Sequence, residues 1–485
     1  ERGITIAAKN TAIQFNGVKI NIVDTPGHAD FGGEVERSLN MVDGAILLVD
    51  ASEGPLPQTR FVLKKALEKD LPLIVVINKI DRPDARIPEV ISETYDLFID
   101  LGALERQIEF PIIYTNAKAG TGGKNPGDIA ANLEPLLQAV IDTIPPPAGD
   151  DRANVQFLVT NLDYDSYVGQ IAIGRLQAGR LEMNSLYTLC ALDGLRAGVR
   201  FSALYTFSGL TKKTVRSAEA GDIIALAGVD GVKIGDTISS ADNPVALPRL
   251  VVDEPTVSMV FCVNDGPFAG RDGRYLTSRH LLERLEKEAL GNVAVRIKKL
   301  ARTDAFEVCG RGELQMAVLI ETMRREGFEL AVSKPQVITK TIDGKVYEPV
   351  ERLFVDIPEE FVGRITEKLS GRRGRLESLV NKGSGRVGME FLIPSRGLIG
   401  FRSQFLTDTK GGGVMNSLLE DYAPWFGAIP QRNTGVLVAD RAGRVTAYAS
   451  YAMEYRGAML VDVGTAVCAG LIVGGRNRQS HVTVN

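Results

Sequence analysis

The stretch Asn21-Ile22-Val23-Asp24-Thr25-Pro26-Gly27-His28 decides the fold, because an apolar strand ends in it and a polar turn follows. β-branched apolar residues over 18–23 predict a buried strand. An acid at the carboxyl end of such a strand, followed by a glycine turn, is typical of a site for Mg²⁺ and phosphate. Asp24 would hold the metal through water, and Gly27 would let its N–H approach a γ-phosphate that a Cβ would obstruct. His28 then lies where it could orient an attacking water.

A second polar turn, Asn78-Lys79-Ile80-Asp81, directly follows an apolar strand expected over 73–77. A carboxylate at Asp81 can accept hydrogen bonds from both N1–H and the exocyclic amine of guanine. Adenine has no N1 proton and would leave Asp81 unpaired, which is costly in a desolvated pocket. Asn78 can tether the neighbouring loops, and the stem of Lys79 can cover one face of the base.

A third polar turn, Tyr114-Thr115-Asn116-Ala117-Lys118, follows a strand expected over 110–113. A backbone N–H near Ala117 could reach O6 of guanine. Polar loops follow strands in many proteins, so each turn alone is weak evidence. The same combination of strand and polar loop occurs three times in a fitting order, and the three turns together predict a site for GTP and GDP with Mg²⁺.

The phosphate loop that such a site needs, G-x-x-x-x-G-K-[ST], does not occur in the sequence. The run Gly120-Thr121-Gly122-Gly123-Lys124 has the wrong spacing and does not lie between a strand and a helix. The chain starts with Glu1 rather than Met and stops in the strand-like run 482–485. We therefore expect an incomplete copy at both ends; the alternative is a pseudo-GTPase that truly lacks the loop.

Length and composition exclude several classes of protein. A chain of 485 residues is too long for one core and predicts about three domains or more. No apolar run approaches the ~20 residues of a membrane span, so we expect no membrane partner. The cysteines lie far apart without a Cys-x-x-Cys pair, which indicates a reducing compartment and no zinc site. The net charge of −4 means that nucleic-acid binding would need a local basic patch.

Strand and helix patterns alternate through residues 1–147 and predict a parallel sheet with ligands at the carboxyl ends of its strands. The loop that precedes the Asp24 strand contains Thr5, a candidate hydroxyl ligand of the metal. The remaining patterns in this region predict a buried strand over 45–49 and helices over 31–42, 59–69, 89–101 and 128–144.

The stiff polar run 145–151, rich in proline, is the clearest domain boundary. Short alternating strands with glycine turns follow it and predict a β-barrel at 152–248. The units at 250–337 and 338–424 each begin with a strand, a helix and two further strands. This repeated order is typical of the ferredoxin-like α+β arrangement. Residues 425–485 read as a partial β-rich domain with strands over 435–439 and 447–451. The expected fold class is therefore multidomain, α/β and β.

Positive charge gathers in the second α+β unit, where 364–386 contains seven basic side chains against two glutamates. Arginines continue into the glycine-rich stretch 395–402, and basic residues among glycines can follow a phosphate backbone closely. A solvated helix face is the alternative for such a charge run. The candidate RNA-binding residues are Arg372, Arg373, Arg375, Lys382, Arg396 and Arg402.

These stretches resemble the translational GTPases of the elongation factor G group. The resemblance rests on Glu1-Arg2-Gly3-Ile4-Thr5 and on the turns at 24–28 and 78–81. Finer marks resemble the BipA (TypA) branch of that group: the segments 27–37, 54–62 and 310–315 and, above all, Ser395-Arg396-Gly397-Leu398-Ile399-Gly400-Phe401-Arg402.

The resemblance covers essentially the whole chain and implies a P-loop GTPase domain, a β-barrel, two ferredoxin-like domains and a BipA-type C-terminal domain. It implies a cytoplasmic, monomeric factor that binds the 70S ribosome or ribosomal subunits and their RNA. It also implies roles in stress responses, growth at low temperature and ribosome assembly. By this resemblance Thr5 would bind Mg²⁺ and Asp24 would hold it through water. Gly27 would contact the γ-phosphate, and His28 would position the hydrolytic water. Asn116 stands where the family usually has serine, which matters little because a backbone N–H makes the contact.

No arginine finger within the chain is evident from the sequence, and such a group can be worth ~10³–10⁵ in rate. We therefore expect slow intrinsic hydrolysis that the ribosome accelerates. One rival is another factor of the elongation factor G type, against which the stretch 395–402 argues. A second is a GTP-gated RNA-binding assembly factor in which hydrolysis only drives release. A metabolic enzyme would need neither two ferredoxin-like units nor a basic patch.

Overall fold

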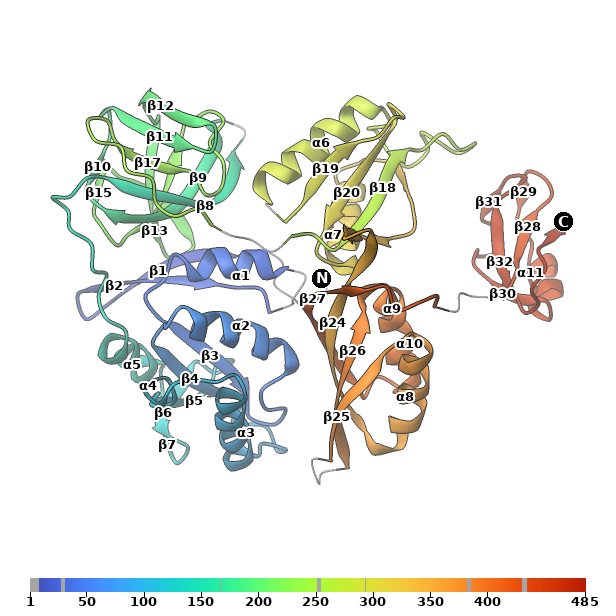
Figure 1. Ribbon diagram of the computed structural model, residues 1–485, viewed down its shortest axis with the longest axis horizontal. Helices are drawn as coiled ribbons and strands as arrows, with labels where there is room; N and C mark the ends of the chain where they lie inside the picture. Colours follow the sequence, from blue (N-terminus) through green and yellow to red (C-terminus); the bar gives the residue numbers. More distant parts are fainter. Residues whose placement is uncertain are drawn as a thin grey trace.

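The computed structural model describes residues 8–27, 31–165, 167–250, 254–292, 294–381, 385–429 and 434–485. Thr5, His28 and Lys382 lie outside these ranges, so the predictions for them concern residues that the structure does not describe. Figure 1 shows the chain as separate sheets in sequence order, from the N-terminal α/β part to the C-terminal β-rich part. Among the described helices, none is both long and apolar enough to cross a membrane.

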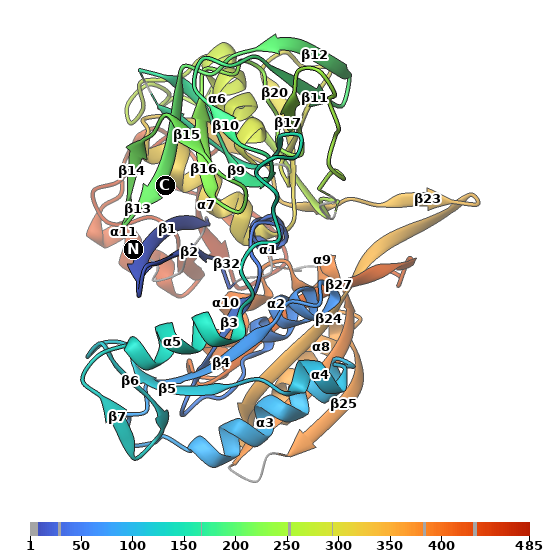
Figure 2. The same ribbon diagram turned by 90° about the vertical axis from the view of Figure 1, so that its left-hand side faces the viewer.

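The first large sheet is doubly wound, as the alternating pattern predicted. Its order is β3-β4-β5-β6-β7, with parallel pairing from β3 to β5. Figure 2 shows α5 and α3 on opposite sides of this sheet. Side chains alternate accordingly: Ile74 and Val76 face Ala139 of α5, whereas Val75 packs with Phe98 of α3. The elements are β3 (Ala45–Asp50), α2 (Pro57–Glu68), β4 (Leu73–Asn78), α3 (Ile87–Asp100), α4 (Glu105–Ile108), β5 (Ile112–Asn116), β6 (Thr121–Asn125), β7 (Asp128–Ala130) and α5 (Glu134–Thr143).

The strand that carries Asp24 does not belong to this sheet. Among the described residues, β2 (Val18–Asp24) pairs with β1 (Lys9–Phe15) alone in a two-stranded hairpin, so the prediction of a buried strand in the parallel sheet was wrong. The hairpin packs by its apolar side against the barrel, where Ala12 and Val23 join a cluster with Phe207, while Ile22 stays exposed.

One helix prediction was also wrong in part, and one strand prediction was wrong. The helix expected over 128–144 starts only at Glu134, because the turn at 125–128, Asn-Pro-Gly-Asp, closes the β6–β7 hairpin first. The strand expected over 447–451 is the helix α11 (Ala447–Glu454). Its first turn is capped by Thr446, whose Oγ1 accepts a hydrogen bond from the N–H of Ala449 at 3.2 Å. The strand over 45–49 is present, but at the sheet edge, where Leu48 is 64% exposed.

The barrel follows the proline-rich run. Its main sheet has the order β12-β11-β17-β8-β9-β16-β13-β14, and β10 (Leu181–Glu182) pairs with β15 (Ser217–Ala218) beside it. Apolar side chains such as Phe157, Leu176 and Ile238 fill its interior. The main strands are β8 (Gln156–Asp165), β9 (Gly169–Ala178), β11 (Tyr187–Ala191), β12 (Gly194–Val199), β13 (Ala203–Ser208), β14 (Thr211–Thr214), β16 (Ile223–Ala227) and β17 (Thr237–Ser240).

Both α+β units have the predicted ferredoxin-like order. The first has β19-β20-β18-β21, with β22 also on β18, and the second has β25-β26-β24-β27, with β23 also on β24. The first contains β18 (Val257–Val263), α6 (Ser278–Gly291), β19 (Arg296–Lys299), β20 (Ala305–Gly310), α7 (Glu313–Arg325), β21 (Leu330–Val332) and β22 (Gln336–Val337). The second contains β23 (Lys340–Ile342), β24 (Lys345–Pro358), η2 (Glu359–Phe361), α8 (Val362–Gly371), β25 (Arg375–Asn381), β26 (Arg386–Pro394), α9 (Ser395–Leu398), α10 (Phe401–Asp408) and β27 (Val414–Pro424). The strand β27 was not predicted from the sequence.

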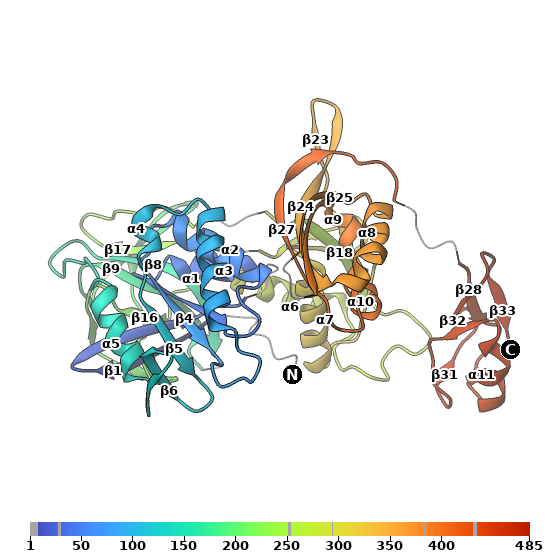
Figure 3. The ribbon, with the colours of Figure 1, turned by 90° about the horizontal axis from the view of Figure 1, so that it is seen from below.

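The C-terminal part is a small β-rich unit that stands beside the second α+β unit and away from the barrel (Figure 3). Its larger sheet has the order β30-β32-β28-β33, with Leu437 and Val473 in the core. Its elements are β28 (Val436–Ala439), β29 (Gly443–Arg444), α11, β30 (Gly457–Met459), β31 (Ala466–Val467), β32 (Ile472–Arg476) and β33 (Val482–Val484).

Candidate guanine-nucleotide site

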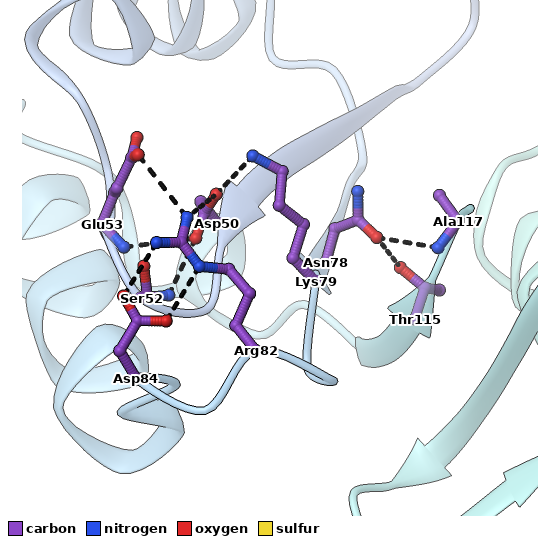
Figure 4. Close-up of polar contacts among 9 residues, drawn as sticks. All are labelled: Asp50, Ser52, Glu53, Asn78, Lys79, Arg82, Asp84, Thr115 and Ala117. Carbon is purple, nitrogen blue, oxygen red and sulfur yellow. Dashed lines mark hydrogen bonds and ion pairs between the residues drawn. The ribbon is translucent and has the colours of Figure 1, made fainter. Parts of the chain in front are cut away.

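The turns after β4 and β5 meet because the two parallel strands end at the same sheet edge, where Asn78 pairs in register with Thr115. The Oδ1 of Asn78 accepts hydrogen bonds from the Thr115 hydroxyl at 3.1 Å and from the Ala117 N–H at 3.0 Å (Figure 4). Thr115 is only 2% exposed, so one side chain holds both turns against a buried anchor. The tether that the sequence suggested for Asn78 is therefore formed within the protein itself.

In this arrangement the carboxylate of Asp81 remains available to a ligand. Its side chain is exposed and makes no hydrogen bond or ion pair within the described part of the chain. The Nδ2 of Asn78 is likewise without a protein partner there, since only its Oδ1 is used. A carboxylate beside an amide donor, both held by a fixed turn, matches the donors and acceptors along one edge of guanine.

The third turn is closed by its own backbone and by Asn116. The Oδ1 of Asn116 accepts from the N–H of Ala119 at 3.1 Å, and the N–H of Gly120 donates to the Ala117 carbonyl. Because the Ala117 N–H is already donated to Asn78, the N–H of Lys118 is the one in this turn that has no partner among the described residues. That donor lies next to the position from which the sequence predicted a contact to O6.

The ammonium of Lys79 has a protein partner, which leaves the proposed role of its stem beside the base as a prediction. Its backbone is left-handed, with φ of 61°, and its Nζ lies 2.6 Å from a carboxylate oxygen of Asp50 at the end of β3. Burial opposes ionisation of Asp50, but hydrogen bonds from Lys79 and from the N–H groups of Ser52 and Glu53 outweigh it, and the pKa of Asp50 is lowered.

Asp50 was not predicted from the sequence, although its place at the end of the strand beside β4 was a usable signal. Arg82 extends the network, since its guanidinium also lies near Asp50 and pairs with Asp84 (Figure 4).

The expected phosphate side is built on other elements. Asp24 ends β2 with an exposed carboxylate that has no partner within the described ranges, and the space around Gly27 is open. Because β2 is not hydrogen-bonded to the parallel sheet, the structure does not bring Asp24 to the sheet edge that holds Asn78. In the described chain no group of three acidic, histidine or cysteine side chains could bind a metal by itself. An acid that supplies one or two ligands beside substrate phosphates still fits Mg²⁺.

The helix that follows this turn, α1 (Gly32–Leu39), is held by the first α+β unit. The Arg311 guanidinium lies 3.2 Å from Glu36 of α1, and both side chains are about nine-tenths buried. A Cβ at Gly32 would come within 2.5 Å of the same guanidinium and 2.8 Å of the Phe61 ring, so a larger residue there would have to displace these side chains. Arg37 donates to the Gly291 carbonyl, and burial, followed by the charge of Arg311, lowers its pKa to about 10.

Among the candidate RNA-binding residues, Arg396 and Arg372 point into the protein. Arg396 forms a two-pronged ion pair with Glu348, whose side chain is fully buried, and its guanidinium lies 3.8 Å from the ring centre of Trp425. Arg372 donates to the carbonyl oxygens of Gly397 and Ile399, at 2.8 and 3.3 Å.

Other basic residues of this unit remain on the surface. Arg373, Arg375 and Arg402 are exposed, and Arg375 is paired with Glu377.

Four family models match the chain. The elongation factor Tu GTP binding domain matches residues 1–146, and elongation factor G domain 2 matches 154–241. The elongation factor G C-terminus matches 345–433, and the TypA/BipA C-terminal domain matches 434–485.

Curated relatives match over the whole of this chain. A protein of Bacillus subtilis named large ribosomal subunit assembly factor BipA is 47% identical over all of this chain and 79% of its own length. The protein of the same name from Salmonella typhimurium is 48% identical over all of this chain and 80% of its own length. A solved structure from Thermus thermophilus shares the fold, with a TM-score of 0.58 at 18% identity, over 87% of this chain and 89% of its own.

Proposed function

The chain belongs to the TypA/BipA family of translational GTPases, and on this premise we propose that it binds ribosomal subunits and assists assembly of the large subunit. It is a hydrolase of guanine nucleotides, with GTP as substrate and GDP and phosphate as products. The proposal includes a cytoplasmic location, a monomeric state and roles in stress and low-temperature adaptation. It also includes division into units at 1–147, 152–248, 250–337, 338–424 and 425–485.

The observation that carries the proposal is the double tether made by Asn78 beside the open carboxylate of Asp81. We assign Asp81 to N1–H and the exocyclic amine of guanine and the N–H of Lys118 to O6, while Ala117 holds this turn through its bond to Asn78. Lys79 would keep the turn in place through Asp50, and its stem would border the base. Asn116 would support this contact by closing its own turn.

On the phosphate side the assignments rest on the sequence motif at 24–28 and on Thr5. Asp24 and Thr5 would hold Mg²⁺, which when bound neutralises charge on the β- and γ-phosphate oxygens. Gly27 offers a backbone N–H with open space around it, suited to a γ-phosphate oxygen. His28 would orient the attacking water. Since Asp24 stands on a separate hairpin, its position depends on the barrel against which that hairpin packs.

For ribosomal RNA we propose the exposed arginines Arg373, Arg375 and Arg402, together with Lys382 from the same basic run. A guanidinium on the surface can exchange a weak ion pair for a phosphate. Arg372 and Arg396 would serve RNA only indirectly, because their inward contacts fix the backbone that carries the others.

The experiment compares hydrolysis of GTP and ATP by the full-length protein, alone and with 70S ribosomes or separated subunits. The proposal expects turnover of GTP only, which ribosomal particles raise strongly. GTP binding without stimulation by 70S particles would favour the alternative in which hydrolysis only drives release of a GTP-gated RNA-binding factor. Immature large subunits are then the next particles to add. Equal turnover of ATP would contradict the assignment of Asp81.

The variant His28→Ala tests the role proposed for that side chain. It should abolish the stimulated turnover and leave GTP affinity within about a few-fold, because a water-positioning group acts on the transition state and not on binding. An equal loss of affinity would contradict it.

A further inference from the structure

One turn of the first α+β unit contacts two other parts of the molecule at the same time. It is the turn Arg311-Gly312-Glu313, between β20 and the start of α7. Arg311 reaches back to α1, and Glu313 reaches forward to the glycine-rich stretch 395–402. None of the nucleotide-site assignments above uses this turn.

The contact with the GTPase part is a buried ion pair. The Arg311 guanidinium and the Glu36 carboxylate are 3.2 Å apart, with side chains 8% and 10% exposed. Lys65 of α2 lies 3.4 Å from the same carboxylate. α1 is the helix that directly follows the Asp24 turn, and segments of this kind change position with the γ-phosphate in GTPases. A displacement of α1 therefore acts on Arg311 first.

The backbone of the turn is held by hydrogen bonds on both sides of Arg311. The Arg311 carbonyl accepts from the hydroxyl of Thr256 at 2.8 Å, and the Arg311 N–H donates to the side chain of Gln315 at 2.8 Å. Thr256 is 4% exposed and Gln315 is 5% exposed. Because Gln315 belongs to the same helix as Glu313, these bonds link the position of Arg311 to that of Glu313.

The contact with the second α+β unit is made by one carboxylate. An oxygen of Glu313 accepts the N–H of Gly400 at 3.0 Å. Gly400 has φ of 69° and joins α9 to α10. In the same stretch Arg396 binds Glu348 and the carbonyl of Gly427, on the segment that leads to the C-terminal unit.

The three parts leave open space where they meet, beside a direct contact in which Arg60 of α2 lies 5.2 Å from the ring centre of Phe354 in β24. A cavity of about 430 Å³ lies there, lined by Phe61 of α2, by Arg311 and Glu313, and by Leu398 and Met415 of the second α+β unit. Close-packed interfaces resist movement, whereas a cavity lets neighbouring units change their angle without crushing side chains. The polar contacts of the turn, together with the contact of α2 with β27 and Phe354, then hold the angle between the units.

We propose that Arg311 and Glu313 are positioning residues that couple α1 to the stretch 395–402 of the second α+β unit. The coupling rests on the proposed function, since its purpose is to let nucleotide state and ribosome contact influence each other. By linkage it acts in both directions: GTP sets the angle of the second α+β unit, and a ribosomal particle bound there sets the position of α1.

The kinetic test uses the full-length protein and 70S ribosomes. Glu313→Ala is expected to lower the stimulated kcat by about 5- to 150-fold, the range of ordinary coupling between sites. Its basal turnover and GTP affinity should stay within about two-fold. Glu313→Gln keeps an acceptor oxygen for Gly400 and should restore kcat. The matched control is Glu321→Ala on the exposed side of the same helix, where the carboxylate pairs only with Arg324 and Arg325 among the described residues. An unchanged stimulated kcat in Glu313→Ala would overturn the proposal.

A second measurement needs no ribosome and so separates this proposal from the proposed function. Spin labels on Ser92→Cys in α3 and Ser370→Cys in α8, both exposed positions, report the distance between the two parts, with Cys262 and Cys468 replaced by serine. The expected result is a distance that differs between the GTP-analogue and GDP states. The difference should be lost in Glu313→Ala and kept in Glu313→Gln and Glu321→Ala. A difference that persists in Glu313→Ala, or none in the parent protein, would overturn the coupling, even if ribosomes stimulate hydrolysis.

Discussion

Two polar stretches of this protein begin at the carboxyl end of a buried strand and are used in opposite ways. The turn after β4 keeps Asp81 exposed and without a protein partner in the described ranges, with its backbone held from behind by Asn78. The stretch after β26 turns Arg396 inward onto the fully buried Glu348. In the sequence both look like ligand-binding loops.

The difference follows from what lies behind each stretch. Behind Asn78 is Thr115, a buried neutral hydroxyl that satisfies the tether and leaves the carboxylate free. Behind Arg396 is a buried carboxylate, which in a dry environment requires a cation close by. A charged side chain is available to a ligand only where the interior does not already need it.

Removing the exposed carboxylate should have the largest effect, and that effect should fall on nucleotide binding. Asp81→Ala loses two charge-assisted hydrogen bonds to guanine, each worth about 1.5–3 kcal/mol, so GTP binding should weaken by about 3–6 kcal/mol. The free energy of unfolding should change by less than about 0.5 kcal/mol, because the side chain is exposed. Calorimetric titration with GTP and chemical denaturation measure the two quantities, and an unchanged affinity would remove Asp81 from the site.

The inward arginine should show the reverse pattern. Arg396→Ala leaves Glu348 buried and unpaired and should cost about 3–5 kcal/mol of unfolding free energy. The matched control Arg375→Ala breaks only an exposed pair with Glu377 and should cost about 0–1 kcal/mol. Denaturant unfolding of both variants gives the comparison. Replacing Arg396 by methionine and Glu348 by glutamine together should be less damaging than Arg396→Ala, and an equal cost for the exposed and buried arginines would contradict the distinction.

Cutting the tether tests whether the guanine turn depends on its support. Asn78→Ala leaves the buried hydroxyl of Thr115 and the N–H of Ala117 without their acceptor and should cost about 1–3 kcal/mol. We expect both the stability and the affinity for GTP to fall, unlike in Asp81→Ala. Asn116→Ala, which loses one exposed hydrogen bond to Ala119, is the milder control. A variant with lost affinity but full stability would mean that Asn78 acts on the nucleotide alone.

The smallest expected effect concerns Asp50 and Lys79. The pKa of Asp50 is lower in the folded protein than its ordinary value of 3.8, so folding is favoured by this group above pH 3.8. That contribution is lost as the pH falls through the folded pKa. Lys79→Met should reduce the free energy of unfolding at neutral pH by about 0.2–1 kcal/mol, since the lysine is half exposed. It should also make the free energy of unfolding fall less steeply as the pH is lowered. Unfolding measured from pH 7 to pH 3 checks this, and an unaltered pH dependence of the unfolding free energy would contradict it.

Much of the architecture was accessible from local sequence. Apolar runs predicted β4 and β5, and the proline-rich run preceded a change to barrel strands, because burial of alternating or continuous apolar residues is a local property. The second α+β unit was predicted in outline, but β27 was missed. Its residues 419–421, Leu-Glu-Asp, lack a clear alternation, and the strand forms by pairing along β24.

Part of the candidate site could likewise be predicted from the sequence, and part was decided only by the fold. The residue types at Asp24, Asn78 and Asp81 sufficed to predict guanine and Mg²⁺ chemistry, because few chemical groups match those ligands. Which of them remain open was decided only in the folded chain: Lys79 turned toward Asp50, the Ala117 N–H was donated to Asn78, and Asp24 lay on a separate hairpin.

The sequence by itself determined the family, the order of the units and the chemistry of the nucleotide turns, since motifs and hydrophobic periods are written over a few adjacent residues. Only the tertiary structure decided the role of each arginine and the route from α1 through Arg311 and Glu313 to Gly400. These contacts join residues tens to hundreds of positions apart. Their strength depends on burial and on which partner lies opposite, and neither is encoded near the residue itself.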